Sequence, residues 1–291
     1  MQQLLQFVLS GVLLGGTYAL ASVGLALIFG VMRVVNFSQA DFMMLAMYAA
    51  FVLWVALHLD PLVSLLLVAP LFFGVGWVYH RLLLSRITGR REAHDAQVIL
   101  TLGTGIVLQA AALIVFGADP RVVHSSLTGA SHLGPLFLDR ARAIAFVIAL
   151  VGSAGLYVFL RYTTPGKVLR AAADDWEAAE YAGIDVQAAH RLAFGLGLAL
   201  TALAGVLITT FRPFGPFIGL QFIVIMFVAV VLGGLGSIMG ALVGGVVVGV
   251  VEVVAQLFLP PVLSPAVVFV LFLLLLYLRP QGLFGQRQRR I

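Results

Sequence analysis

The chain of 291 residues has no cysteine and few charged side chains. The lack of cysteine excludes disulfides, thiolate metal sites and a cysteine nucleophile. Only 10% of the residues are charged and 62% are hydrophobic, which excludes an ordinary soluble domain, where about a quarter of the residues are charged. The hydrophobic residues suffice for eight or nine bilayer-spanning helices of about 20 residues each. The composition therefore predicts an all-α, polytopic transmembrane helix bundle that forms a single domain over residues 1–291.

Motifs of the common enzyme classes are also missing. The chain has no G-x-x-x-x-G-K-[ST] phosphate loop, no H-E-x-x-H zinc motif and no Ser-His-Asp arrangement. Its six histidines show no i, i+4 pair, so we expect them at membrane interfaces or in loops. Residues 1–6 lack the basic segment of a signal peptide, so no cleavage is expected. The sequence predicts no catalytic residue, no metal site and no cofactor bound by this chain.

Nine apolar runs, bounded by charged residues, proline or glycine clusters, are candidate membrane spans. They cover residues 8–30, 42–59, 62–83, 96–117, 142–160, 192–211, 220–235, 238–258 and 262–278. The uninterrupted stretch 220–259 is too long for one span, and the glycine-rich segment 233–237 is its natural break. Eight or nine spans are therefore expected.

The distribution of Lys and Arg between the two sets of connections predicts the orientation in the membrane. One set carries four: Arg121, Arg140, Arg142 and Arg212. The other set carries thirteen: Arg33, Arg81, Arg86, Arg90, Arg91, Arg161, Lys167, Arg170, Arg191, Arg279, Arg287, Arg289 and Arg290. The loops 84–95 and 161–191 and the C-terminal tail are thus expected in the cytoplasm, with the N-terminus outside. The net charge of +5 then reflects topology rather than nucleic-acid binding.

Residues 161–191 form the long polar loop of the predicted inner face. Pro165 suits the first turn of a short helix. Asp174, with Glu177 three residues later, has the spacing of a capping box, and Gly183 fits a helix C-cap. The spacing predicts a short helix over 175–182 that presents Trp176, Ala178, Ala179 and Tyr181. The alternative is a solvated loop with ordinary capping residues.

Four stretches of the chain together resemble the branched-chain amino acid permease family of ABC importers (the Liv type). Thr163–Ala171, followed by Glu177-Ala178-Ala179 and Gly183-Ile184, is similar to the "EAA" loop of such permeases. The other stretches are 24–42 (GLALIFGVMRVVNFSQADF), 231–237 (VLGGLGS) and 279–285 (RPQGLFG). The resemblance runs from the first span to the tail. No Ile-x-Leu-Pro follows Gly183, a feature that Liv-type subunits share.

The resemblance implies a permease subunit of the bacterial inner membrane that imports branched-chain or related small amino acids. It implies four kinds of neighbour: two cytoplasmic ABC ATPases, which bind the ATP; a second homologous permease subunit, in a heterodimer or homodimer; an extracytoplasmic substrate-binding protein; and membrane lipids. The residues expected to couple to an ATPase are Gly166, Arg170, Asp174, Trp176, Glu177, Ala178, Ala179 and Gly183. Alternatives are a permease of the same family for amides or urea-like solutes, an ion-coupled secondary transporter, and a structural membrane subunit.

Polar residues within the apolar sequence are candidates for a substrate pathway, because such groups are costly in a bilayer. Glu252 is the acidic residue expected inside a span, where it either lines the outer half of a path or bonds a neighbouring helix. A second candidate set is Asn36, Ser38, Gln39 and Asp41. The Ser38–Asp41 spacing predicts a capped start of the second span at the inner interface; the alternative is a helix break at the pathway, where a helix N-terminus contacts a substrate carboxylate.

Two further features concern packing and the outer face. Small residues recur at Gly236, Gly240, Gly244, Gly245 and Gly249, which predicts a face for close helix packing. The outer loop 118–141, with Asp119, Arg121, Asp139 and Arg140, and the turn 212–219 would contact a binding protein. The alternative is a solvated loop with interfacial arginines.

Overall fold

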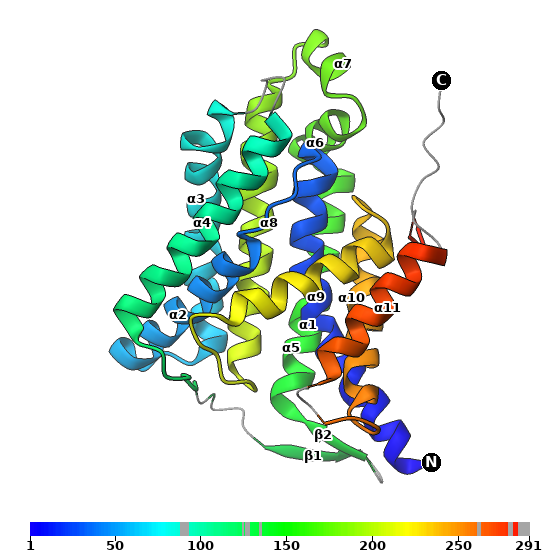
Figure 1. Ribbon diagram of the computed structural model, residues 1–291. Coiled ribbons are helices and arrows are strands. Elements are labelled where there is room, and N and C mark those ends of the chain that lie inside the picture. Colours follow the sequence, from blue (N-terminus) through cyan, green and yellow to red (C-terminus); the bar gives the residue numbers. More distant parts are fainter. Residues whose placement is uncertain are drawn as a thin grey trace.

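A bundle of long apolar helices makes up most of the molecule (Figure 1). The computed structural model describes residues 1–87, 93–123, 125, 129–133, 136–260, 263–278 and 282–284. The elements are α1 (Gln2–Met32), α2 (Gln39–Leu57), α3 (Pro61–Leu82), the 3-10 turn η1 (Leu84–Arg86), α4 (Ala93–Phe116), β1 (Ala130–Leu133), β2 (Leu136–Asp139), α5 (Arg140–Tyr162), α6 (Thr164–Asp174), α7 (Trp176–Tyr181), α8 (Val186–Thr209), α9 (Ile218–Gly233), α10 (Ile238–Ala255) and α11 (Ser264–Leu278).

The predicted transmembrane bundle is confirmed. Within the described residues, seven helices are long and apolar enough to cross a membrane, and α9 and α11 are shorter apolar helices. Together they coincide with the nine predicted runs. The predicted break is also present, because α9 ends at Gly233 and Ser237 caps α10 by accepting a hydrogen bond from the Gly240 N–H at 3.0 Å.

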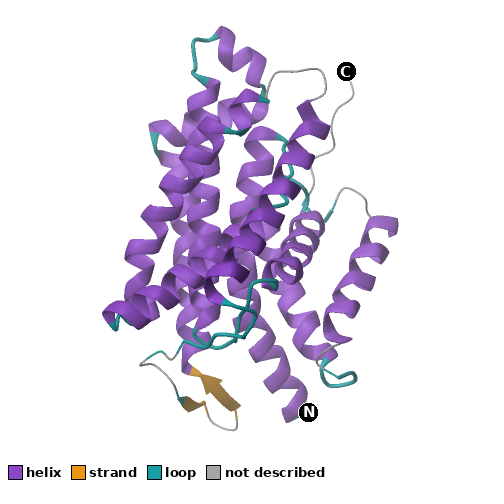
Figure 2. Ribbon diagram, turned by 60° about the vertical axis from the view of Figure 1, so that its left-hand side comes forward, coloured by secondary structure: helices purple, strands orange, loops and turns teal. Residues whose placement is uncertain are grey.

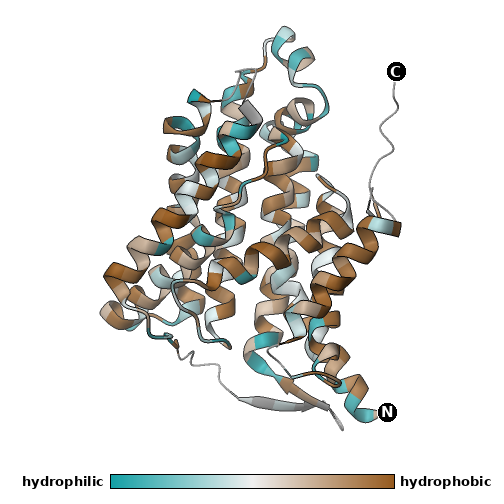
Figure 3. Ribbon diagram, viewed as in Figure 1, coloured by the Kyte–Doolittle hydropathy of each residue, from teal (hydrophilic) through white to brown (hydrophobic). Residues whose placement is uncertain are grey.

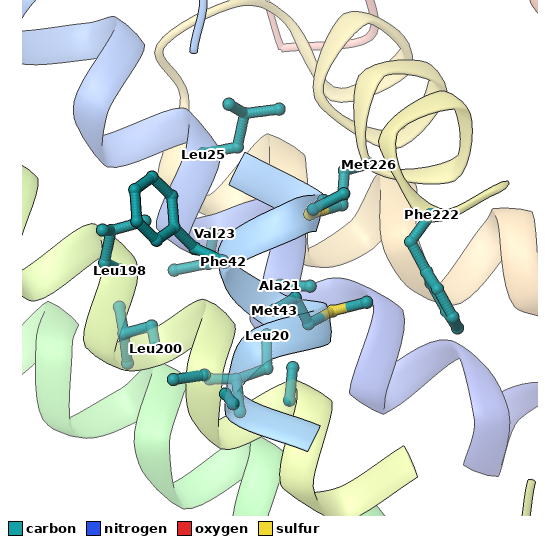
Figure 4. Close-up of a cluster of buried hydrophobic side chains, with 14 of the residues drawn as sticks. Leu20, Ala21, Val23, Leu25, Phe42, Met43, Leu198, Leu200, Phe222 and Met226 are labelled. Atoms are coloured by element: carbon teal, nitrogen blue, oxygen red, sulfur yellow. The ribbon is translucent and has the colours of Figure 1, made fainter. Parts of the chain in front are cut away.

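Helices α1 and α8 form the centre of the bundle, and α4 and α5 lie at its periphery. Side chains of α1, α2, α8 and α9 meet in the core, which includes Leu20, Met43, Leu198 and Phe222 (Figure 4). Hydrophobic residues cover the length of the bundle, whereas hydrophilic residues gather at its two ends (Figure 3). This distribution is that of a helical protein in a bilayer.

Glycines allow α10 to lie directly against α1 and α9. A Cβ on Gly245 would collide with the backbone of Ala19, and one on Gly249 with that of Gly15. Gly240 and Gly244 approach α9 in the same way, at Gly233 and Ala229. Gly236 departs from the predicted helical face, because it lies in the turn before α10 with φ 81° and packs on Gly30.

Helix α9 departs from the predicted span 220–235. Its 16 residues extend for about 24 Å at 1.5 Å per residue, less than the roughly 30 Å of a hydrocarbon core. Figure 1 shows it strongly inclined across the front of the bundle. By its own length α9 is therefore shorter than a full bilayer-spanning helix.

Part of the predicted outer loop 118–141 forms a β-hairpin. β1 and β2 pair antiparallel, with Ala130 opposite Asp139 (Figure 2). The Gln6 side chain joins this hairpin to α1, because it donates to the Phe137 carbonyl at 2.7 Å and accepts from the Phe137 N–H at 2.9 Å. Asp139, one of the charged residues predicted to contact a binding protein, has a structural role as well. It caps α5 by accepting a hydrogen bond from the Ala141 N–H at 3.0 Å.

Several basic residues used to predict orientation lie outside the described residues. They are Arg90, Arg91, Arg279, Arg287, Arg289 and Arg290. Within the described part of the chain, Leu283 and Phe284 donate backbone hydrogen bonds to the carbonyls of Leu232 and Gly233 at 2.8 and 3.1 Å. The last of the four family-like stretches thus contacts the third.

Candidate functional site

The chain between α1 and α2 runs inside the bundle. α1 ends with Arg33 in the left-handed conformation (φ 54°), and α2 begins six residues later at Gln39. Asn36 and Ser38 between them are fully buried. Figure 1 shows α2 starting well below the end of α1 rather than level with it. The prediction of a capped helix start at the inner interface is therefore wrong, and the alternative of a buried helix break describes the geometry.

The polar side chains of this break bond to one another instead of forming a capping box. Ser38 occupies the N-cap position, yet its Oγ donates to Asn36 Oδ1 at 2.7 Å. Asn36 Nδ2 donates to Gln39 Oε1 at 2.8 Å. The Asp41 carboxylate does not bond the backbone at the N-cap, as a capping box requires, because it bonds Gln109 of α4 instead. The short network satisfies polar groups that would otherwise be costly in an apolar interior.

Gln39 fastens the break to α8. Its Nε2 donates to Thr201 Oγ1 at 2.6 Å, and the Thr201 hydroxyl lies 3.0 Å from the Gly197 carbonyl. Sequence reasoning missed Thr201. The sequence marks this position only by a hydroxyl in the middle of an apolar run. Such a hydroxyl is weak evidence for a contact with another helix, because threonine in a helix often bonds the backbone of its own helix.

Asp41 lies in the first turn of α2, between α4 and the start of α9. It is 5% exposed and accepts a hydrogen bond from Gln109 Nε2 of α4 at 2.8 Å. Gly105 and Gly219 press against its carboxylate, and a Cβ on either would collide with an oxygen. None of the ion pairs within the described part of the chain includes Asp41. Glu252 is thus not alone as an acidic residue inside a helical span, and Gln109 is a second residue that sequence reasoning missed.

Glu252 belongs to a separate polar cluster at the C-terminal end of α10. It is 4% exposed, and its Oε1 lies 4.0 Å from Arg212 Nη1. Arg212 also donates to the Tyr18 hydroxyl at 3.3 Å and to Gln221 Oε1 at 3.2 Å. These contacts join α1, α9 and α10 to the turn after α8. They favour the interpretation that Glu252 bonds neighbouring elements over the one in which it lines a path.

The polar loop 161–191 folds as two helices on the far end of the bundle from the N-terminus (Figure 1). α6 is capped by Thr163, whose Oγ1 accepts from the Gly166 N–H at 3.1 Å. Gly166, Leu169 and Ala172 are buried on one side of α6, while Arg170 is exposed. A Cβ on Gly166 would collide with the backbone of Phe159 and Leu160. α6 is therefore seated closely on the end of α5.

α7 matches the predicted short helix, with one correction at its start. Asp175 is the N-cap and accepts from the Ala178 N–H at 3.0 Å, whereas Asp174 is the last residue of α6. Because Asp174 and Asp175 are adjacent and aspartate is a good N-cap at either position, the sequence pattern could not decide which of them caps the helix. Gly183 follows the C-cap with φ 83°, a conformation that favours glycine.

α7 exposes its large side chains and buries a small one. The exposed fractions of Trp176 and Tyr181 are 50% and 91%, while Ala179 is 5% exposed. Glu177 and Ala178 are also exposed. The helix therefore projects an aromatic and acidic surface beyond the end of the bundle, where Figure 3 shows hydrophilic residues.

Two of the histidines predicted at membrane interfaces or in loops lie at helix ends, His80 in the last turn of α3 and His190 near the start of α8, and both are buried within the protein. His80 of α3 is fully buried, His190 of α8 is 7% exposed, and their ring centroids are 6.0 Å apart. Because the two histidines are 110 residues apart in the sequence, no local pattern predicts that their rings meet. Among the described residues, no group of three or more His, Cys, Asp or Glu could hold a metal ion.

The family model for "Branched-chain amino acid transport system / permease component" matches residues 7–276. The chain belongs to this permease family. Within it, the chain is 31% identical to the high-affinity branched-chain amino acid transport permease LivH of Salmonella typhimurium and 30% identical to LivH of Escherichia coli K12. It is 28% identical to the corresponding protein BraD of Pseudomonas aeruginosa. Each comparison covers 97% of this chain and 96% of the relative. No solved structure matches.

Membership of the permease family defines the general role of the chain. Its relatives are transport permeases rather than enzymes, and its apolar helices make it a multi-pass membrane protein. The family resemblance stated from the four sequence stretches is confirmed. The polar groups described above are therefore to be understood as parts of a transport subunit.

Proposed function

We propose that this chain is the membrane-spanning permease subunit of an ATP-driven ABC importer for branched-chain or related small amino acids. It lies in the bacterial inner membrane with its N-terminus outside and its C-terminus in the cytoplasm. The observation that carries the proposal is α7, a short capped helix with exposed aromatic and acidic side chains at one end of the bundle. The similarity to LivH and BraD over nearly the whole chain supports the substrate class.

The proposed complex contains two cytoplasmic ATPases, a second homologous permease subunit and an extracytoplasmic binding protein. The ATPases bind the ATP, because the chain has no phosphate loop of its own. α7 docks into a groove on one ATPase. The outer hairpin β1–β2 and the turn after α8 receive the binding protein.

The mechanism is a rigid-body movement passed from α7 into the bundle. α6 connects α7 to the membrane helices and contacts α1, α5 and α8. α8 in turn holds the buried break through Thr201 and Gln39. A displacement of α7 when the ATPases close therefore reaches the polar residues between α1 and α2. Asn36, Ser38, Gln39 and Asp41 line the pathway in this proposal, and Glu252 braces its outer end.

A secondary transporter is the main alternative, since buried carboxylates are used for ion coupling in such proteins. It gives α7 no role, because a self-sufficient transporter needs no docking helix. The relatives also favour the importer, as LivH and BraD are permeases of branched-chain amino acid transport systems.

Co-purification of the tagged chain from its native membrane tests the proposal. We expect two ATPase subunits and a homologous permease to remain bound, and the associated binding protein to be stabilised by aliphatic amino acids in a thermal-shift screen. Isolation of the chain alone, in a form that transports an amino acid down an ion gradient, would overturn it. A binding protein that responds only to amides or urea-like solutes would change the substrate class.

A further inference from the structure

We infer that Asp41 binds the ammonium group of the transported solute. The inference rests on the proposed function and deepens it, because it names the chemical group that the membrane subunit recognises. Asp41 is 5% exposed, and its one hydrogen-bond donor in the described residues is the neutral amide of Gln109. The other buried carboxylate, Glu252, has the guanidinium of Arg212 at 4.0 Å. Of the two, Asp41 is the one whose charge is left for a ligand.

Glycines surround the Asp41 carboxylate, and no cationic side chain of the described residues pairs with it. Gly105 of α4 and Gly219 of α9 each lie so close that a side chain would occupy the position of a carboxylate oxygen. A charged group within the membrane is costly and is retained where it pairs with another charge or serves a pathway. A bound ammonium would supply the missing charge and a strong, charge-assisted hydrogen bond.

The location of Asp41 favours a cation over an anion. The positive ends of helix dipoles attract anions, and the sequence alone suggested that the start of α2 meets a substrate carboxylate. Asp41 itself occupies the first turn of α2 and abuts the second residue of α9. Its negative charge offsets both helix ends, so a second carboxylate there would be repelled. The ammonium end of a zwitterionic amino acid fits this site.

Access to Asp41 requires movement of α4, which covers it through Gly105 and Gln109. α4 packs on the described chain chiefly through α2. Its outer side is open, with Ile106, Val107 and Ile114 each more than 60% exposed. A helix held on one side is free to move in a transport cycle without breaking the core formed by α1 and α8. Displacement of α4 would remove Gln109 from Asp41 and uncover the carboxylate.

The inference separates two substrate classes that the sequence left open. Amino acids carry an ammonium group at neutral pH, whereas amides and urea-like solutes do not. A carboxylate without a cationic side chain as partner binds a charged ammonium group more strongly than it binds a neutral solute, which favours the amino acids. The alternative role for Asp41 is packing, with Gln109 as its permanent partner.

The test uses Asp41→Asn in the complete transporter, reconstituted in proteoliposomes with saturating binding protein and radiolabelled L-leucine. Asparagine keeps the shape and the oxygen that accepts from Gln109 but removes the charge. We expect leucine uptake to fall at least tenfold. The matched control is Asp60→Asn, the same substitution at the N-cap of α3, where asparagine caps as well as aspartate and uptake should be unchanged.

Two leucine analogues distinguish a binding role of Asp41 from a packing role. Isopentylamine is leucine without its carboxylate, and 4-methylpentanoate is leucine without its ammonium group. Each is added on the side opposite to the binding protein. We expect isopentylamine to inhibit wild type and Asp60→Asn at least tenfold more strongly than Asp41→Asn, and 4-methylpentanoate to inhibit all three alike. Equal inhibition by isopentylamine in all three, or full uptake by Asp41→Asn, contradicts the inference. Wild type that takes up no small amino acid would instead overturn the proposed function, and the inference with it.

A second variant covers the case in which Asp41→Asn fails to fold. Gln109→Lys places a built-in ammonium beside Asp41. We expect this variant to insert, to be at least as stable as wild type and to lose leucine uptake at least tenfold, because the site is filled. A destabilised Gln109→Lys protein, or one that still transports, would show that Asp41 has a packing role.

Discussion

At the scale of single residues, the contact between α1 and α10 depends on glycines that leave no space for a methyl group. Gly249 meets the backbone of Gly15, so Gly249→Ala must push the two helices apart. We expect a loss of about 1–3 kcal/mol, typical of overpacking, seen as a lower melting temperature in detergent. Gly155→Ala is the control, because nothing lies within 4 Å of that position, and it should be neutral or stabilising. Equal melting temperatures for both variants would show that the helices are less closely packed.

Glu252 illustrates how a buried charge is held by its neighbours. Glu252→Gln leaves Arg212 without its ionic partner inside the cluster with Tyr18 and Gln221. We expect a loss of about 1–3 kcal/mol, below the about 3–5 kcal/mol of a fully buried pair, because the Arg212 side chain is 29% exposed. Uptake kinetics should persist, while Glu180→Gln on the exposed side of α7 should leave the melting temperature unchanged. Altered uptake with unchanged stability would place Glu252 in the pathway.

At the scale of elements, α7 depends on one cap. Asp175 satisfies the Ala178 N–H, and six residues are too few to remain helical without such help. Asp175→Ala should cost about 1 kcal/mol locally, unfold α7 and abolish uptake while the protein still inserts. Asp175→Asn, which keeps an oxygen that can accept from the Ala178 N–H, should transport normally. Normal uptake by Asp175→Ala, measured with labelled leucine, would contradict coupling through α7.

Much of the element order could be predicted because hydropathy alone sets the length of a span. The helix starts and ends at Pro165, Gly183 and the 233–237 turn could also be predicted, because proline and glycine mark a local backbone geometry that depends on a few adjacent residues. The depth of the break at Asn36–Asp41 could not be predicted, since a capping pattern has the same spacing at an interface and within a bundle. Partners distant in sequence, such as Thr201, Gln109 and Arg212, left no local pattern. They are found once the helices are placed together.

At the scale of the whole molecule, the natural lack of cysteine makes the orientation directly measurable. Gln3 near the start of α1 and Tyr181 at the end of α7 are both exposed. The N-terminus and α7 lie at opposite ends of the bundle (Figure 1). In intact cells, a membrane-impermeant thiol reagent should label Gln3→Cys. It should label Tyr181→Cys only after permeabilisation. The reverse pattern would place α7 outside the cell, away from any ATPase.

The distribution of charge over the whole molecule fits the proposal that the chain works with partners. Its charged groups are gathered at the two ends of the bundle, where the resemblance places an ATPase and a binding protein. Among the described residues, the buried carboxylates are Asp41 and Glu252, and each lies in a small polar cluster. Such a subunit is suited to passing on movement and offering a path, with energy supplied from outside.

The most direct test of this account is uptake of labelled leucine into proteoliposomes that contain the complete transporter. We predict that uptake requires ATP on the α7 side and loaded binding protein on the hairpin side, persists when ion gradients are collapsed, and is lost with Asp175→Ala. Uptake that continues without ATP and follows an imposed ion gradient would contradict the account.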